Sequence, residues 1–180
     1  MKKIAVIMTI LFVTLTTIGC KQQEQKQQQV NYTPASPPVL MEIDQRQQAA
    51  RMTPKNPEVW INLGNVLMDS QRFSEAVDAY EKAIALEPKN VDVLVDLGTC
   101  YRGIGKFDKA VELYRKALKI NPTFPNGHLN LGVVLGFDLH KNAEGAKEIK
   151  RFLELVPNGP QSDQARQAVQ QLTSGDSAGK

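Results

Sequence analysis

An internal repeat constrains this 180-residue chain more than any other feature, because residues 57–90 align with residues 91–124 at a period of 34 without a gap. Along the two segments, paired positions hold the same or a similar kind of residue. The pairs are Trp60/Leu94, Leu63/Leu97, Gly64/Gly98, Leu67/Tyr101, Phe73/Phe107, Ala76/Ala110, Tyr80/Tyr114, Ala83/Ala117 and Pro88/Pro122. A period of this length predicts a stack of small structural units that bury their apolar faces against their neighbours.

Each unit shows two helical stripes. Trp60, Leu63 and Leu67 recur at the i, i+3 and i+7 spacing of one helix face, and a second stripe follows in the second half of the unit. Pro88 is expected to end the second helix, because its ring blocks continuation. Gly64 is expected where two helices approach closely. The expected helices are residues 39–53, 57–70, 74–87, 91–104, 108–121, 125–138, 142–156 and 161–173.

A third unit, residues 125–158, departs from the pattern. Its second helix is out of phase by one residue, and Phe152 stands where the second unit has Ala117. A larger side chain there implies a different neighbour, so we expect the regular stack to end. Residues 159–173 are expected to form a C-terminal capping helix, residues 39–56 an N-terminal capping helix, and residues 174–180 a disordered tail.

The pattern W-x₂-L-G-x₂-L…A-x₃-Y-x₂-A…P resembles the tetratricopeptide repeat. The resemblance implies an all-α fold, an α-α superhelix of about three repeats (57–90, 91–124 and 125–158) plus the two capping helices. It also implies a concave groove that binds a protein or peptide partner, without catalysis.

In this family one stripe of each first helix lines the groove, and in this sequence a polar column (Asn62, Asp96 and Asn130) lies beside that stripe. The corresponding residues here are Ile61, Asn62, Asn65, Met68, Val95, Asp96, Thr99, Arg102, Leu129, Asn130 and Val133. Apolar positions flanked by amides suit a peptide. The alternative is that Ile61, Val95 and Leu129 simply contact the second helices.

Some members of the family hold a C-terminal carboxylate with Lys and Asn side chains in this groove. Here Ile61 and Asp96 occupy the positions of that Lys and Asn, and Asn126 and Asn130 occupy positions that would need cations. We therefore expect no carboxylate clamp of this kind.

The N-terminus has the features of an export signal. Lys2 and Lys3 precede an apolar run over residues 4–18 that is short for a membrane span. The stretch LTTIGC at residues 15–20 resembles the bacterial lipoprotein box, although Thr17 stands where Leu is usual. The resemblance implies removal of residues 1–19 and acylation of Cys20, palmitate included. An ordinary signal peptide with an incidental cysteine is the alternative.

Residues 20–38 are rich in Gln and Pro and predict a flexible tether. Because Lys21 rather than Asp follows the cysteine, lipoprotein sorting in Gram-negative bacteria favours the outer membrane, on its periplasmic face. The net charge is +3, or +1 once Lys2 and Lys3 are removed with the signal. So small a charge gives no footprint for nucleic acid.

Catalytic, metal and cofactor motifs are absent from the sequence. Cys100 has no accompanying histidine and is interpreted as a packed thiol. His128 lies in the Trp60 packing column and is expected to be half-buried, while the loop around His140 holds too few ligands for a metal. The glycines at residues 103–106 are interpreted as a turn. We expect no enzyme, no cofactor, no metal and no small-molecule substrate.

Two hypotheses for function follow. The first is a lipid-anchored scaffold that binds a peptide segment of another cell-envelope protein. The second, from the small number of repeats, is an accessory protein of cytochrome c maturation that holds the tail of an apocytochrome or of a haem lyase.

Overall fold

The computed structural model describes residues 36–174, which form eight α-helices and one π-helical segment. These elements are α1 (Pro37–Met52), α2 (Pro57–Asp69), α3 (Phe73–Leu86), α4 (Val91–Gly103), α5 (Phe107–Ile120), α6 (Pro125–Val133), η1 (Val134–Asp138), α7 (Asn142–Leu155) and α8 (Pro160–Ser174). No strand occurs within this range, so the expected all-α fold is confirmed. The predicted signal, Cys20, most of the tether and residues 175–180 lie outside the described residues.

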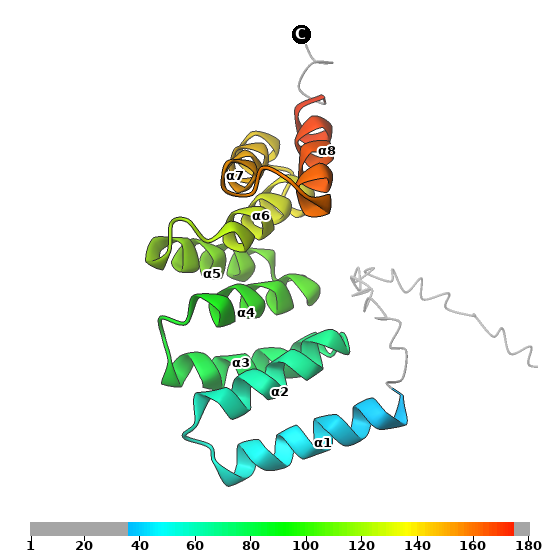
Figure 1. The fold of residues 1–180 in the computed structure, drawn as a ribbon, viewed down its shortest axis with the longest axis vertical. Coiled ribbons are helices and arrows are strands. Elements are labelled where there is room, and N and C mark those ends of the chain that lie inside the picture. The colour runs from blue at the N-terminus through cyan, green and yellow to red at the C-terminus, as the bar shows by residue number, and fades with distance from the viewer. Residues whose placement is uncertain (1–35, 175–180) are drawn as a thin grey trace, which may run out of the picture. The chain divides into compact units, whose positions relative to one another are not determined.

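The helices follow one another in a stack, each packed against the helix before it and the helix after it (Figure 1). The bounds of all α-helices except α6 lie within two residues of those expected. Pro37 and Pro38, expected in the tether, instead form the first turn of α1. Proline is tolerated there because the first amide groups of a helix have no partner within the helix.

Local signals explain where the helices of the first two repeats begin. The side-chain oxygen of Asn56 accepts a hydrogen bond from the amide of Glu58 at 3.1 Å, and Pro57 is the first helical residue. The side chain of Asn90 accepts from the amide of Val93 at 3.2 Å. Both asparagines therefore satisfy amide groups that the helix itself leaves unpaired.

A glycine lies beneath a tyrosine ring in each of these repeats. A Cβ atom on Gly64 would lie 2.5 Å from the Tyr80 ring, and one on Gly98 would lie 2.6 Å from the Tyr114 ring. Both tyrosines are fully buried. The predicted close approach of the helices at these glycines is therefore confirmed, with the ring of the second helix filling the space.

The third repeat contains one extra residue, and the structure shows where it is absorbed. In repeats one and two, the backbone amide just after the first helix donates to a carbonyl five residues earlier. These hydrogen bonds run from Arg72 to Leu67 and from Lys106 to Tyr101. In the third repeat Lys141 donates six residues back, to Leu135. Helix α6 accordingly changes to the π form at Val134, where the expectation was a continuous helix over 125–138. A π turn accommodates one additional residue, which accounts for the shift in phase.

The C-terminal end of the stack is closed by α8. Phe152 is fully buried in a cluster with Ile149, Ala165 and Leu172, so a helix outside the repeat pattern provides its neighbours. The hydroxyl of Ser162 donates to the carbonyl of Val156 at 2.8 Å and fixes the start of this helix. The predicted capping role of this segment is confirmed.

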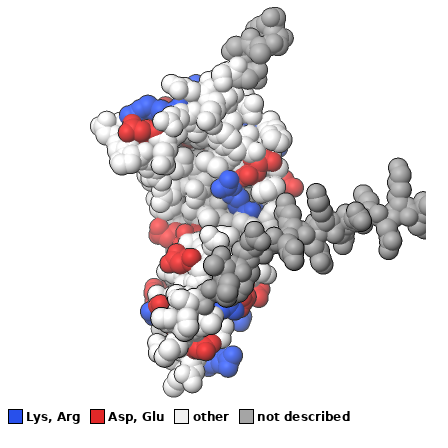
Figure 2. All heavy atoms as spheres, turned by 90° about the vertical axis from the view of Figure 1, so that its right-hand side faces the viewer, with Lys and Arg blue, Asp and Glu red and all other residues white. Residues whose placement is uncertain are grey.

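Charges are dispersed on the face that Figure 2 turns toward the viewer, where Lys and Arg form small groups that alternate with Asp and Glu. No continuous basic stripe crosses that view. Within residues 36–174, no helix combines the length and the apolar character needed to cross a membrane.

Candidate functional site

The candidate site is one face of the first helices of the three repeats, which we call the inner face. It comprises the predicted residues on α2 (Ile61, Asn62, Asn65, Met68), α4 (Val95, Asp96, Thr99, Arg102) and α6 (Leu129, Asn130, Val133). Because the period is 34, these residues recur at equivalent positions, for example Asn62, Asp96 and Asn130. Between repeats two and three, a hydrogen bond joins two of them, Thr99 and Asn130.

The apolar column of this face is only partly open. Val95 is 4% exposed and belongs to the core. Of the two interpretations of this column, packing within the protein therefore applies to Val95. Ile61 and Leu129 are half-buried and keep part of their side chains at the surface. Open apolar surface at this column therefore comes from repeats one and three.

Tyrosines of the second helices reach the polar positions of the inner face. Tyr80 donates from its hydroxyl to the side-chain oxygen of Asn65 at 2.7 Å. One repeat later, the hydroxyl groups of Thr99 and Tyr114 lie 3.2 Å apart. Because Thr99 donates its only proton to the carbonyl of Val95, Tyr114 is the donor in this pair. The tyrosine that covers the glycine thus also positions a polar group on the inner face.

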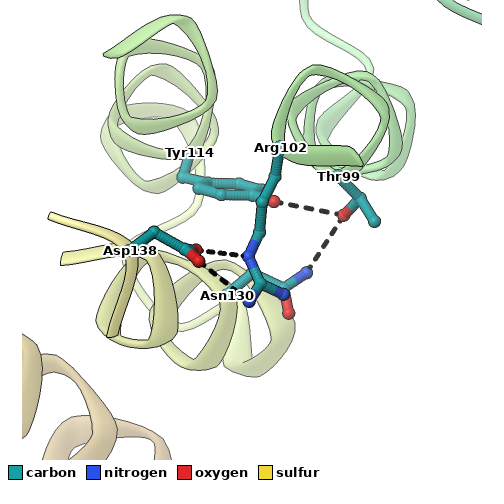
Figure 3. A network of polar contacts seen from close by, with 5 residues as sticks. All are labelled: Thr99, Arg102, Tyr114, Asn130 and Asp138. Carbon is teal, nitrogen blue, oxygen red and sulfur yellow. Dashed lines mark hydrogen bonds and ion pairs between the residues drawn. The ribbon is translucent and has the colours of Figure 1, made fainter. Parts of the chain in front are cut away.

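A polar network joins repeats two and three (Figure 3). Asn130 donates to the hydroxyl of Thr99 at 3.4 Å, and the guanidinium of Arg102 pairs with Asp138, with Nε 2.5 Å from Oδ2. Asp138 ends the π segment, so the extra residue of the third repeat brings this carboxylate to Arg102. Sequence reasoning placed Arg102 on the inner face but missed its partner, because nothing in the 34-residue pattern signals a π turn.

Asp96 is a charged group of the inner face that has no partner within the described residues. Its side chain is half-buried, and no hydrogen bond or ion pair is formed to it within the described residues. Burial, with the nearby charges of Asp92 and Asp69, raises the pKa of this carboxyl group to about 6. The fold therefore holds a carboxylate at a place where its charge is unfavourable.

Cys100 is fully buried beside this carboxylate. Burial, with a smaller contribution from the charge of Asp96, raises the pKa of the thiol to about 12. A thiolate is the reactive form of cysteine, so the geometry describes a packed thiol, as expected from the sequence.

His128 is more buried than expected, at 9% exposed, and it joins two elements. Its Nε2 lies 3.0 Å from the carbonyl oxygen of Pro122, and its Nδ1 lies 2.7 Å from the Glu148 carboxylate on α7. Both partners are hydrogen-bond acceptors, so the ring links the Pro122 carbonyl to the Glu148 carboxylate of α7. Trp60 makes the equivalent bond in repeat one, to the carbonyl of Pro54 at 2.8 Å. His128 therefore has a structural role.

We expect His128→Leu to destabilise the protein by about 1 kcal/mol, because Glu148 and the Pro122 carbonyl lose a buried donor. Leu94 occupies the equivalent position in repeat two, so leucine fits the repeat pattern. A double-mutant cycle with Glu148→Ala, followed by urea unfolding, measures the coupling between the two side chains. Strictly additive losses would contradict the pairing.

His140 takes a left-handed backbone conformation with φ of 55°, as do Gln71 and Gly105 at the turns of the other two repeats. These positions are equivalent once the extra residue is counted, and Gly105 confirms the turn predicted for residues 103–106. Within residues 36–174, no group of three or more His, Cys, Asp or Glu side chains is arranged to hold a metal ion.

Comparison with known proteins agrees with this architecture. Residues 47–84 and 61–125 match a family model described as the tetratricopeptide repeat. This match supports tetratricopeptide repeats in that part of the chain, and the described residues fold as the corresponding α-α superhelix. Proteins built from such repeats are generally protein-interaction scaffolds that bind protein or peptide partners, and not enzymes. A search of curated proteins found no match.

Solved structures similar to this chain include the crystal structure of MamA, at 18% identity and a TM-score of 0.70, covering 75% of this chain and 77% of that chain. The Arabidopsis OM64 TPR domain matches at 23% identity and a TM-score of 0.61, covering 66% and 94%. The first TPR of Spaghetti (RPAP3), bound to the HSP90 peptide SRMEEVD, matches at 24% identity and a TM-score of 0.63, covering 67% and 93%. At these identities the likeness concerns the fold.

Proposed function

We propose that this chain is a non-enzymatic scaffold of the bacterial cell envelope, anchored by a lipid on Cys20, that binds a peptide segment of another envelope protein on its inner face. The observation that carries the binding role is the inner face itself. Ile61, Leu129 and Val133 leave apolar surface open beside the amides of Asn62 and Asn130. A structure of the same fold was solved with a peptide bound, which supports this use of the superhelix.

The proposed anchor rests on the sequence around Gly19 and Cys20. Two or three acyl chains on one residue give durable attachment, whereas a single chain does not. We place the protein on the periplasmic face of the outer membrane, because Lys21 follows the cysteine. In a bacterium that processes lipoproteins, labelled palmitate should be incorporated into the full chain and not into the Cys20→Ala variant. Equal labelling of both would exclude this anchor.

Capture of partners from envelope extracts tests the binding role. We expect Ile61→Glu with Leu129→Glu in the full chain to lose the captured proteins, because two carboxylates would interrupt the apolar surface. Val95 is unsuitable for this change because it belongs to the core. The matched control is Leu86→Glu with Ile120→Glu, two apolar residues that are 42% and 40% exposed at the ends of α3 and α5.

Circular dichroism of both double variants should show unchanged helix content. Retention of the same partners by the inner-face variant, or an equal loss in the control, would remove the inner face from the proposed function.

A further inference from the structure

Negative charge is concentrated on the elements that form the inner face. Together α2, α4, α6 and η1 carry five carboxylates and one guanidinium, a net charge of −4 with histidine counted as neutral. The carboxylates are Glu58, Asp69, Asp92, Asp96 and Asp138, and the guanidinium is Arg102. The whole chain has a net charge of +3, so composition alone does not produce this acidic face.

The one guanidinium of these elements is already neutralised. Arg102 pairs with Asp138 through Nε at 2.5 Å and through Nη2 at 3.5 Å, so neither group is free for a partner. The other four carboxylates form no ion pair within the described residues. Their charge is therefore available to a ligand, and all four lie on α2 and α4.

Two of these four carboxylates, Asp69 and Asp96, do not stabilise the fold. Glu58 and Asp92 lie in the first turns of their helices, where negative charge is favourable. Asp69, however, ends α2, where negative charge is unfavourable. Asp96 is half-buried, and its pKa is raised first by this burial and then by the charges of Asp92 and Asp69. A cation bound near Asp69 and Asp96 would reduce this repulsion. The two carboxylates are therefore better explained by a cationic partner than by the stability of the unbound protein.

The third repeat presents a different surface. On α6 the inner face consists of Leu129, Asn130 and Val133, with Asn126 in the first turn and no unpaired charge. Leu129 and Val133 are half-buried and pack on the C-terminal apolar cluster. The inner face therefore has an acidic part over α2 and α4 and an apolar, amide-bearing part over α6.

We propose that the inner face binds a basic peptide segment, with Lys or Arg side chains over α2 and α4 and apolar side chains over α6. This inference rests on the proposed function and names the chemistry of its partner. Coulomb attraction to four unpaired carboxylates favours cations at the first two repeats. The same carboxylates repel an acidic segment. In this respect the expected partner differs from SRMEEVD, the acidic peptide bound in the similar Spaghetti structure.

Three labelled peptides test this chemistry on the full chain by fluorescence anisotropy: KAKGLLGL and its counterparts with Gln or with Glu in place of both Lys residues. We expect the Lys peptide to bind at least tenfold more tightly than the Glu peptide. Raising NaCl from 50 to 300 mM should weaken the Lys peptide several-fold, because salt screens exposed charges. Tighter or equal binding of the Glu peptide overturns the inference.

Matched variants locate the interaction. Asp92→Asn with Asp96→Asn should weaken the Lys peptide at least fivefold and leave the Gln peptide unchanged. Asp78→Asn with Glu112→Gln removes the same charge from α3 and α5 and should leave both peptides unchanged. An equal loss in the two double variants would assign the effect to net charge and overturn the proposed surface.

The peptide assay separates this inference from the proposed function. Equal binding of the Lys and Gln peptides, abolished by Ile61→Glu with Leu129→Glu, would leave the scaffold role standing and refute the preference for cations. Absence of binding by the Lys peptide refutes the preference as well, and the capture experiment with envelope extracts then decides the scaffold role independently.

Discussion

Replacing Gly145 with alanine is expected to destabilise the protein by about 2–3 kcal/mol. A Cβ atom at this position would lie 2.6 Å from the Cα and the amide nitrogen of Gly136 and 2.7 Å from the carbonyl oxygen of Gly132. These are backbone atoms of α6 and η1, so no side chain can rotate away. The clash outweighs the gain of about 1 kcal/mol that alanine brings to a helix interior.

The destabilisation by alanine is expected only in the third repeat, because the first two repeats already have alanine at the equivalent position. Ala76 and Ala110, the residues that align with Gly145, are accepted and fully buried in repeats one and two. In the third repeat the π segment brings Gly136 against α7, which leaves no room for a methyl group. Urea unfolding followed by circular dichroism measures the loss. Lys147→Ala, on the exposed face of the same helix, is the control and should change stability by less than about 0.5 kcal/mol.

A loss below about 1 kcal/mol for Gly145→Ala would mean that α6 and α7 can separate without penalty. That outcome would contradict the close backbone contact and with it the account of the π segment.

Asp96→Asn is expected to have the opposite sign and to stabilise the protein by about 1–2 kcal/mol at pH 7.5, after allowance for the solvent exposure of the group. The pKa of Asp96 is raised to about 6 in the folded protein, from the ordinary value of 3.8. Ionisation is therefore more costly in the folded than in the unfolded chain. Asparagine removes the charge, and Asn62 and Asn130 show that it fits the equivalent positions.

The stability gained in Asp96→Asn should depend on pH. The unfavourable contribution of Asp96 develops as the pH rises from about 3.8 to about 6 and is constant above that range. The gain in Asp96→Asn should be complete at pH 7.5, shrink between pH 6 and pH 4, and vanish below pH 4. Thermal unfolding of both proteins across this range measures it, with Asp44→Asn on the exposed surface of α1 as control.

A gain that does not change with pH would assign the stabilisation of Asp96→Asn to packing and not to charge. If Asp96→Asn also binds the Lys peptide less well, then Asp96 lowers the stability of the fold and increases the affinity for the peptide. Such an exchange is common where a binding group is placed in an unfavourable environment.

Periodic features of this protein could be predicted from the sequence with good accuracy. The 34-residue alignment located the helices of the repeats and the close contacts at Gly64 and Gly98, and the helical spacing of apolar residues located α8. These features depend on residue type at regular spacing, which a single sequence displays directly. The repeat also places the inner-face residues at equivalent positions of each first helix, and their role in binding stays a prediction.

Polar pairing between repeats could not be predicted. The bonds of Arg102 with Asp138 and of His128 with Glu148 depend on side-chain conformations and on the position of one extra residue. The alignment showed that this residue exists but not that α6 absorbs it in a π turn. Likewise, the burial of Val95 depends on how closely the second helices approach, which the spacing of apolar residues does not specify.

The way in which α8 covers Phe152 bears on how this architecture can be lengthened. Residues 91–124 begin and end in the register of the repeat, so a duplicated copy of them placed after residue 124 would meet surfaces of the kind already present on either side. A copy placed after Val156 would instead have to displace the cap and would leave Phe152 without its neighbours. Growth of such an array, by gene duplication or by design, is therefore expected before the α7–α8 cap and not after it.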